Sequence, residues 1–176
     1  MQEIELDGDN ILKLSGLQLF RTEADKLDTK IIDQIISKSR QPHVMKFEKH
    51  EDTEGRFKDR GSYKSWASKS RIVYALLNST DGDLAGIIWF GSRQNPGIDP
   101  KYSLTFGIRL YEGYLGEGFS KPLMVASHSD IKNILPERYI WLDYDENNLI
   151  AGKAYKSFGY EELGREDGRI IMGKEL

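Results

Sequence analysis

The sequence predicts one mixed α/β domain spanning residues 1–176, in which helices cover both faces of a mostly antiparallel sheet. Three observations support this fold class. Residues 71–110 contain apolar, strand-like runs joined by turns, which is the pattern of antiparallel strands. Beyond residue 110, strands alternate with stretches of helical period, which places helices against the sheet. The chain also has the length of a single domain, and we find no linker, repeat or low-complexity segment in it.

The first third of the chain is expected to supply one outer strand and the early helices. Residues 10–20 are apolar enough for a strand or a pair of strands. Residues 23–38 place leucine and isoleucine three and four positions apart, the period of an amphipathic helix, which stops before Pro42. Residues 43–70 hold several aromatic side chains but are interrupted by glycines, so we expect one broken helix there.

The rest of the chain divides clearly. The expected strands are residues 71–78, 84–90, 102–110, 138–144, 160–165 and 169–174. The expected helices are residues 120–135 and 148–158. Asp81-Gly82 and Asp167-Gly168 are turn signals that join the first and the last pair of these strands into hairpins.

Composition excludes several classes of protein. Hydrophobic residues make up 39% and charged residues 30% of the chain, a balance that excludes intrinsic disorder. The chain has no cysteine, which excludes disulfides and a cysteine nucleophile. Its three histidines lack metal-ligand spacing, so no metal is expected.

Charge and hydropathy argue against nucleic acid and membranes as partners. The net charge is −3, which disfavours nucleic-acid binding as the main function. No uncharged run is longer than residues 84–92, which are far too few to cross a bilayer. The acidic N-terminal residues do not resemble a secretory signal, and we expect a cytoplasmic protein.

A glycine-rich loop stands between the strand 102–110 and the helix 120–135. Gly113, Gly116 and Gly118 permit positive φ angles, so that successive N–H groups can converge on an anion at the start of the helix. A phosphate cradle and a plain tight turn are equally good interpretations of this segment taken alone. The sequence contains neither the P-loop motif nor the dinucleotide fingerprint.

This loop resembles the loop motif of the GNAT superfamily of acyl-CoA-dependent N-acyltransferases, Val-x4-(Arg/Gln)-x2-Gly-x-(Gly/Ala). Leu110, Gly118 and Ser120 match that motif, whereas Leu115 stands where Arg or Gln is usual. The segment 148–160 is similar to a second family motif, Asn-x2-Ala-x3-Tyr-x3-Gly-(Phe/Tyr), with every spacing kept.

An ordinary core helix that contains a tyrosine would explain the second motif alone, but its distance and order relative to the loop favour the family. The resemblance extends from about residue 10 to residue 176 and implies a GNAT-like sheet splayed in its middle.

The resemblance implies transfer of an acetyl group from acetyl-CoA to a primary amine of a small molecule or peptide, by direct attack in a ternary complex. The pantetheine arm would pair with the backbone near Ile108 and Leu110. The pyrophosphate would lie on the loop, at Leu115, Gly116, Glu117, Gly118, Phe119 and Ser120, with Lys121 as a further phosphate partner.

The resemblance also assigns catalytic roles. Tyr155 matches the general acid that protonates the departing thiolate, and Asn148 would bond the cofactor arm or cap its own helix. The general base is open: Asp143 is one candidate, but a polar turn between strand and helix explains the acidic segment 143–148 slightly better.

The acceptor side and the alternatives complete these expectations. Phe57, Tyr63 and Trp66 would shape the acceptor pocket, unless they are ordinary core residues. A non-catalytic acyl-CoA-binding module, its loop weakened by Leu115, is the main alternative, and a plain interaction protein is another. The resemblance allows a monomer or a homodimer.

Overall fold

The computed structural model describes residues 1–48 and 55–176. Its strands are β1 (Gln2–Ile4), β2 (Leu17–Glu23), β3 (Ile72–Asn78), β4 (Leu84–Ser92), β5 (Leu104–Leu110), β6 (Tyr139–Asp145), β7 (Glu161–Glu166) and β8 (Arg169–Glu175). The helices among the described residues are α1 (Ile11–Leu14), α2 (Thr29–Lys38), α3 (Pro42–Met45), α5 (Arg60–Ala67), α6 (Ser120–Ile134) and α7 (Leu149–Ser157), with a 3-10 turn at Ala24–Lys26.

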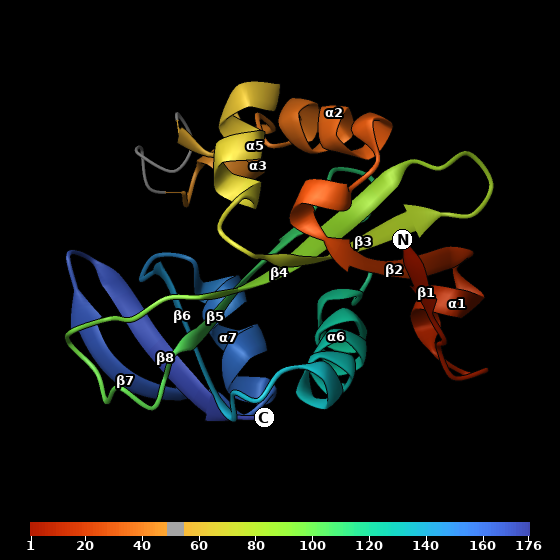
Figure 1. Ribbon diagram of the computed structural model, residues 1–176. Coiled ribbons are helices and arrows are strands. Elements are labelled where there is room, and N and C mark those ends of the chain that lie inside the picture. The colour runs from red at the N-terminus through yellow and green to blue at the C-terminus, as the bar shows by residue number, and fades with distance from the viewer. Residues whose placement is uncertain (49–54) are drawn as a thin grey trace.

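The strands form one eight-stranded sheet in the order β1-β2-β3-β4-β5-β6-β8-β7. Every neighbouring pair is antiparallel except β5 and β6, which are parallel. Helices α2, α3 and α5 lie on one face of the sheet, here called the upper face, and α6 and α7 lie on the other (Figure 1). The predicted fold class is therefore confirmed.

The expected strand at residues 10–20 is wrong in its first half. Asn10 accepts a hydrogen bond from the N–H of Leu12 at 3.0 Å and so caps the short helix α1. The strand begins only at Leu17, after Gly16 has turned the chain with φ of +69°. Strand β1, which pairs with β2, has no counterpart in the prediction.

The early helices differ in their boundaries from the expected ones. Helix α2 begins after Asp28, whose carboxylate accepts from the N–H of Lys30 at 2.8 Å. Within the segment 43–70, where one broken helix was expected, the structure has α3 and α5, and residues 49–54 lie outside the described residues. Asp59 begins α5 through a capping box, so that Gly61 lies inside this helix and does not interrupt it.

A hydrophobic core lies on each face of the sheet, because the central strands are buried on both sides. On the lower face, residues of α6 and α7 pack against the sheet, and this core contains Leu123 of α6 and Phe106 of β5. On the upper face, α2 and α5 pack Ile35 and Trp66 against Trp89 of β4. These two layers hold the central strands rigidly between them.

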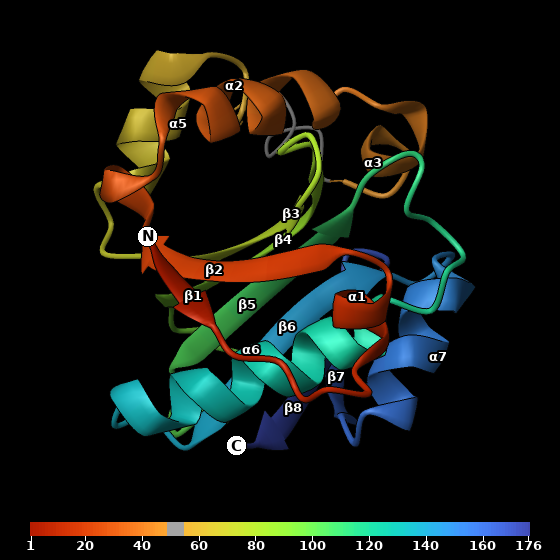
Figure 2. The ribbon, with the colours of Figure 1, turned by 90° about the vertical axis from the view of Figure 1, so that its right-hand side faces the viewer.

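The parallel pair β5–β6 separates soon after it begins. The two strands pair only at Leu104↔Ile140 and Thr105↔Trp141, and their remaining residues have no partner across the gap. Figure 2 shows the two strands running in the same direction at the centre of the sheet. The expected splay between these strands is therefore confirmed, and it opens toward their C-terminal ends.

Candidate active site

The backbone of β5 faces into the splay at alternate residues. The N–H of Tyr111 donates to the carbonyl of Ala85 on β4 at 2.9 Å, so Tyr111 points its backbone groups away from the gap. Alternation along an antiparallel strand then directs those of Ile108 and Leu110 toward the gap. The carbonyl of Leu110 accepts from Nε2 of His43 at 3.1 Å. This exposed edge is the one expected to pair with an extended cofactor arm.

The glycine loop lies between the open end of β5 and the N-terminus of α6. Gly113, Gly116 and Gly118 have φ of +89°, +80° and +77°, and no atom lies within 4 Å of a Cβ built at any of them. Within the described part of the chain, the backbone N–H groups of residues 115–121 donate no hydrogen bond. No side chain caps the N-terminus of α6 either. These free donors fit the oxygens of a pyrophosphate.

Tyr155 lies beside the gap among other aromatic rings. Its ring centroid is 5.6 Å from that of Tyr144 and 6.1 Å from that of Phe106. Burial raises the pKa of the Tyr155 phenol above its usual value; Arg169 opposes this shift, whereas Asp143 and Glu48 add to it. The phenol on α7 therefore lies within electrostatic reach of charges from β6, β8 and the segment after α3.

Asn148 and Asp143 already have partners within the fold. Asn148 caps α7 by accepting from the N–H of Ala151 at 3.2 Å, as one of its two interpretations requires. Oδ2 of Asp143 lies 2.8 Å from Nε of Arg169, which also donates to the backbone carbonyl of Asp143 at 3.0 Å. A carboxylate held by a guanidinium is a weak proton acceptor, so the ion pair argues against Asp143 as the base.

The three aromatic residues expected at the acceptor pocket are placed in the core of the upper face. Phe57, Tyr63 and Trp66 are only 3%, 1% and 7% exposed. The hydroxyl of Tyr63 donates to the carbonyl of Ala24 at 2.8 Å. Phe57 and Trp66 pack against Trp89, which agrees with the alternative interpretation that these are ordinary core residues.

The structure adds charged residues that the sequence analysis did not identify. Arg109 is buried on the upper face, with Nη2 2.6 Å from Oε1 of Glu48 and Nη1 2.7 Å from Oγ of Ser39. Its guanidinium lies 4.9 Å from the ring centroid of Phe57. An arginine within the apolar strand 102–110 was a detectable signal, whereas nothing in the sequence relates Glu48 to this strand.

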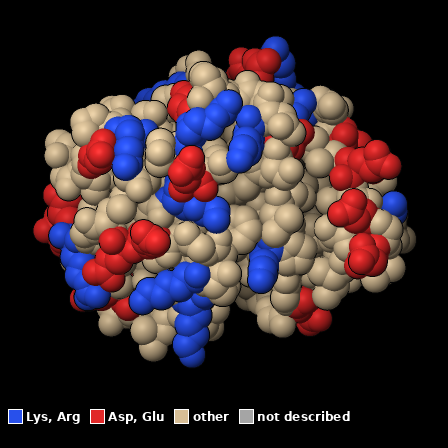
Figure 3. Space-filling view, turned by 90° about the horizontal axis from the view of Figure 1, so that it is seen from below, with Lys and Arg blue, Asp and Glu red and all other residues tan. Residues whose placement is uncertain are grey.

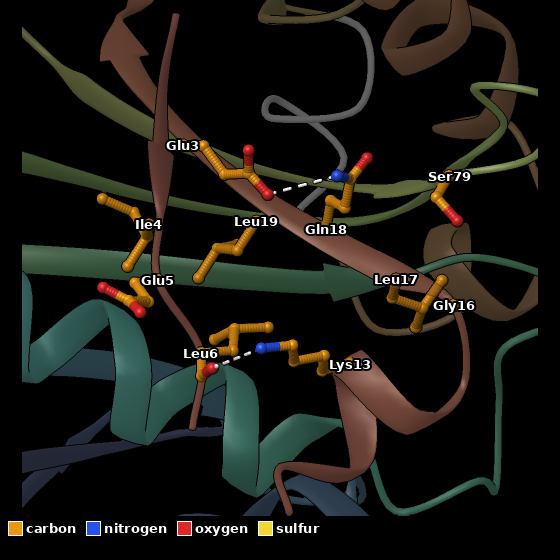
Figure 4. A pocket seen from close by; sticks show the side chains of 10 residues that line it. All are labelled: Glu3, Ile4, Glu5, Leu6, Lys13, Gly16, Leu17, Gln18, Leu19 and Ser79. Atoms are coloured by element: carbon orange, nitrogen blue, oxygen red, sulfur yellow. Dashed lines mark hydrogen bonds between the residues drawn. The ribbon is translucent and has the colours of Figure 1, made fainter. Parts of the chain in front are cut away.

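Two cavities differ in their relation to these residues. A cavity of about 580 Å³ lies between β1, β2 and α1, beyond three other strands from the splay (Figure 4). None of the predicted site residues lines it. A smaller cavity of about 50 Å³ is lined by Arg93, Asn95, Trp141, Asp143, Glu166, Asp167, Arg169 and Ile171.

Three further observations concern membranes, metals and surface charge. No helix within residues 1–48 and 55–176 is long and apolar enough to cross a membrane. In the same residues, no three histidine or acidic side chains gather as a metal site would require. The face that carries α6 and α7 intersperses basic with acidic residues (Figure 3).

Solved structures share this fold over nearly the whole chain. An acetyltransferase of the GNAT family from Listeria monocytogenes gives a TM-score of 0.66 at 19% identity, covering 99% of this chain and 100% of that chain. The spermidine N-acetyltransferase from Vibrio cholerae, solved with CoA and spermine, gives 0.67 at 15% identity, covering 92% and 96%. At these identities the likeness establishes the fold, which is that of the GNAT acetyltransferases.

The sequence is also similar to that of an N-acetyltransferase. The chain is 30% identical over 100 residues to spermine/spermidine N(1)-acetyltransferase of Bacillus subtilis. The match covers 54% of this chain and 66% of the relative, just under two thirds of the relative's length. No protein-family model matches the chain. Fold and sequence thus both make the chain similar to acetyltransferases of the GNAT fold.

Proposed function

We propose that the protein is an N-acetyltransferase that transfers an acetyl group from acetyl-CoA to a primary amine of a small molecule. The observation that carries this proposal is the set of free backbone N–H groups at residues 115–121, in a loop that lies beside the splay between β5 and β6. A cradle for phosphate and an unpaired strand edge are what a CoA thioester needs in order to bind in an extended form.

Backbone groups do most of the donor binding in this proposal. The N–H groups of the loop hold the pyrophosphate, with Lys121 as a charged partner. The edge of β5 at Ile108 and Leu110 pairs with the pantetheine amides and orients the thioester. The side chain of Leu115 is 44% exposed and carries no charge. Binding of the pyrophosphate by backbone N–H groups does not require a charge on this side chain.

Tyr155 acts as the general acid. The amine attacks the thioester carbonyl, so that the C–N bond forms, the C–S bond breaks and the sulfur leaves with the electron pair. Tyr155 donates its proton to that sulfur, and solvent accepts the proton that the amine loses. Because burial raises the pKa of Tyr155, the phenol is protonated at neutral pH and ready to donate.

The acceptor class is supported by the relatives. The Bacillus subtilis relative and the Vibrio cholerae structure are named for acetylation of spermine or spermidine, which are small amines. This supports a small-molecule acceptor over a peptide.

Two measurements, made one after the other, test the proposal. Acetyl-CoA at about 100 times its dissociation constant should stabilise the protein by roughly 2.7 kcal/mol, a rise of roughly 5–10 °C in Tm. Release of free CoA thiol is then measured with a panel of amines. Binding without thiol release from any amine supports the non-catalytic module, and the absence of binding at millimolar acetyl-CoA overturns both functions.

A further inference from the structure

Arginine side chains gather on the upper face where β3 begins and β4 ends. Arg71 directly precedes β3, and Arg93 directly follows β4. The side chain of Arg71 crosses over Gly91, with Cγ 3.1 Å from the position that a Cβ of Gly91 would take. Burial lowers the pKa of Arg71, and the positive charges of Arg56 and Arg93 lower it further. The guanidinium groups of Arg56 and Arg93 thus each lie close enough to that of Arg71 to repel it.

Two of these arginines have no carboxylate partner among the described residues. Arg71 donates to the backbone carbonyl of Trp66 at 2.6 Å and stacks 4.9 Å from its ring centroid. Arg93 stacks 5.4 Å from the ring centroid of Trp141. Like charges held together on aromatic surfaces cost free energy, which a bound anion offsets. The pair Arg71 and Arg93 therefore has the chemistry of an anion site.

Arg93 lines a cavity that also holds residues near the proposed general acid. Arg93 and Trp141 line the cavity of about 50 Å³, and so do Asp143 and Arg169, whose charges act on Tyr155. Asp143 is two residues beyond Trp141 on the same face of β6, a distance of about 7 Å along the strand. A molecule whose amine is close to Tyr155 can therefore place a second group, several bonds away, beside Arg93.

The carboxylates around this cavity leave Arg93 available. Asp143 is held by Arg169 at 2.8 Å. Glu166 and Asp167 are exposed in the turn between β7 and β8, and no ion pair joins either of them to Arg93 within the described structure. Water screens the charges of these two exposed carboxylates, and the guanidinium of Arg93, which is also exposed, lies over the ring of the buried Trp141.

We propose that the acceptor carries a carboxylate several bonds from its reacting amine, and that Arg93, with Arg71 behind it, binds this carboxylate. The proposal rests on the proposed acetyltransferase function and deepens it. It separates this protein from its relatives named for polyamines, because a polyamine would bring a second positive charge to the arginines.

Three amines with the same carbon chain test the proposal by their far end alone. Aminocaproate ends in a carboxylate, hexylamine in a methyl group and hexamethylenediamine in a second ammonium. We expect kcat/KM to be roughly tenfold higher for aminocaproate than for hexylamine, and lower still for the diamine. Arg93→Ala should abolish the preference for aminocaproate while leaving the rate with hexylamine unchanged, and Arg93→Lys should restore part of it.

Arg60→Ala is the matched control, because Arg60 is an exposed arginine paired with Asp33 on the helices α5 and α2. It should keep the full preference. A diamine that reacts faster than aminocaproate, or a preference that survives Arg93→Ala, overturns the proposal while leaving the acetyltransferase function intact.

A binding measurement keeps the proposal testable even if none of the three amines is acetylated. Calorimetry of acetamidocaproate with the CoA-bound protein should give a dissociation constant that rises roughly tenfold in Arg93→Ala. Equal binding, or none, in the wild type and this variant overturns the proposal. Failure of the acetyltransferase function itself has a different signature, since acetyl-CoA would then neither stabilise the protein nor release thiol.

Discussion

The two sides of the splay are built from different parts of the chain. On the proposed donor side, one continuous segment, residues 104–121, supplies an open strand edge and a loop with free backbone N–H groups. On the upper face, which is the proposed acceptor side, the charged side chains come from distant segments: Glu48 pairs with Arg109, whereas Arg93 and Arg169 line one cavity. A site built from backbone N–H groups needs glycines, and their spacing can be recognised in the sequence. A site built from side chains uses charged residues that form no local pattern and look like ordinary surface residues.

The largest expected effect comes from changing Tyr155, the proposed general acid, which lies between the donor and acceptor sides. Tyr155→Phe should lower turnover tenfold or more, because the thiolate then leaves without a proton donor. Acetyl-CoA binding should stay nearly unchanged, since the ring and its packing against Tyr144 are retained. Steady-state kinetics at saturating acetyl-CoA and amine measure the effect.

The control for this variant is Tyr139→Phe. It removes a phenolic hydroxyl outside the splay between β5 and β6, from a ring that lies next to Lys101. It should leave turnover unchanged. Full turnover in Tyr155→Phe would falsify the assignment of the general acid, and a parallel loss of acetyl-CoA binding would make Tyr155 a binding residue.

The second effect concerns the donor side alone. Gly116→Ala places a Cβ in the cradle and forces alanine into a left-handed conformation that costs about 1–2 kcal/mol. We expect the dissociation constant of acetyl-CoA to rise roughly tenfold, because the shifted loop no longer directs its N–H groups to one point. Calorimetry measures this change.

Gly82→Ala is the control, since Gly82 also has a positive φ, +72°, and open space around it, but lies in the β3–β4 hairpin. Both variants should lose similar stability, and only Gly116→Ala should lose affinity. Equal affinities in the two variants would show that the loop is a plain turn.

The same contrast explains what could be predicted from the sequence. The loop and the helix with Tyr155 were predicted because glycine spacing and helical period are local properties, whereas the splay was expected only from the resemblance to the GNAT family. The boundary of β2 was missed because Asn10 and Gly16 form a capped helical turn inside an apolar run. The placement of Phe57 could not be decided either, because an aromatic side chain has the same local pattern in a core as in a pocket.

The acceptor side could not be predicted for the same reason. Arg71 and Arg93 are ordinary strand-flanking arginines in the sequence, and only the antiparallel pairing of β3 with β4 brings them together. The ion pair of Asp143 with Arg169 likewise depends on the pairing of β6 with β8. Side-chain contacts across strands require the register of the sheet, and local periodicity does not supply that register.

The smallest expected effect tests how the donor side is anchored. Helix α6, whose N-terminus forms part of the cradle, carries the buried His128, which hydrogen-bonds the hydroxyl of Tyr160 at 2.7 Å. Burial lowers the pKa of His128 to about 3, so the folded protein keeps it neutral while the unfolded chain takes up a proton below about pH 6.5. The unfolded state therefore binds more protons in this range, and stability must fall as pH falls from about 6.5 toward 3, by up to about 1.4 kcal/mol per pH unit.

Denaturant unfolding of the wild type and of His128→Gln across this pH range measures the contribution of His128. The carboxylates titrate in both proteins, so their effect cancels in the difference between the two stability curves. The variant should be less stable at neutral pH and should lose stability less steeply on acidification. Parallel curves would show that His128 is protonated in the folded state and does not hold α6 as a neutral partner of Tyr160.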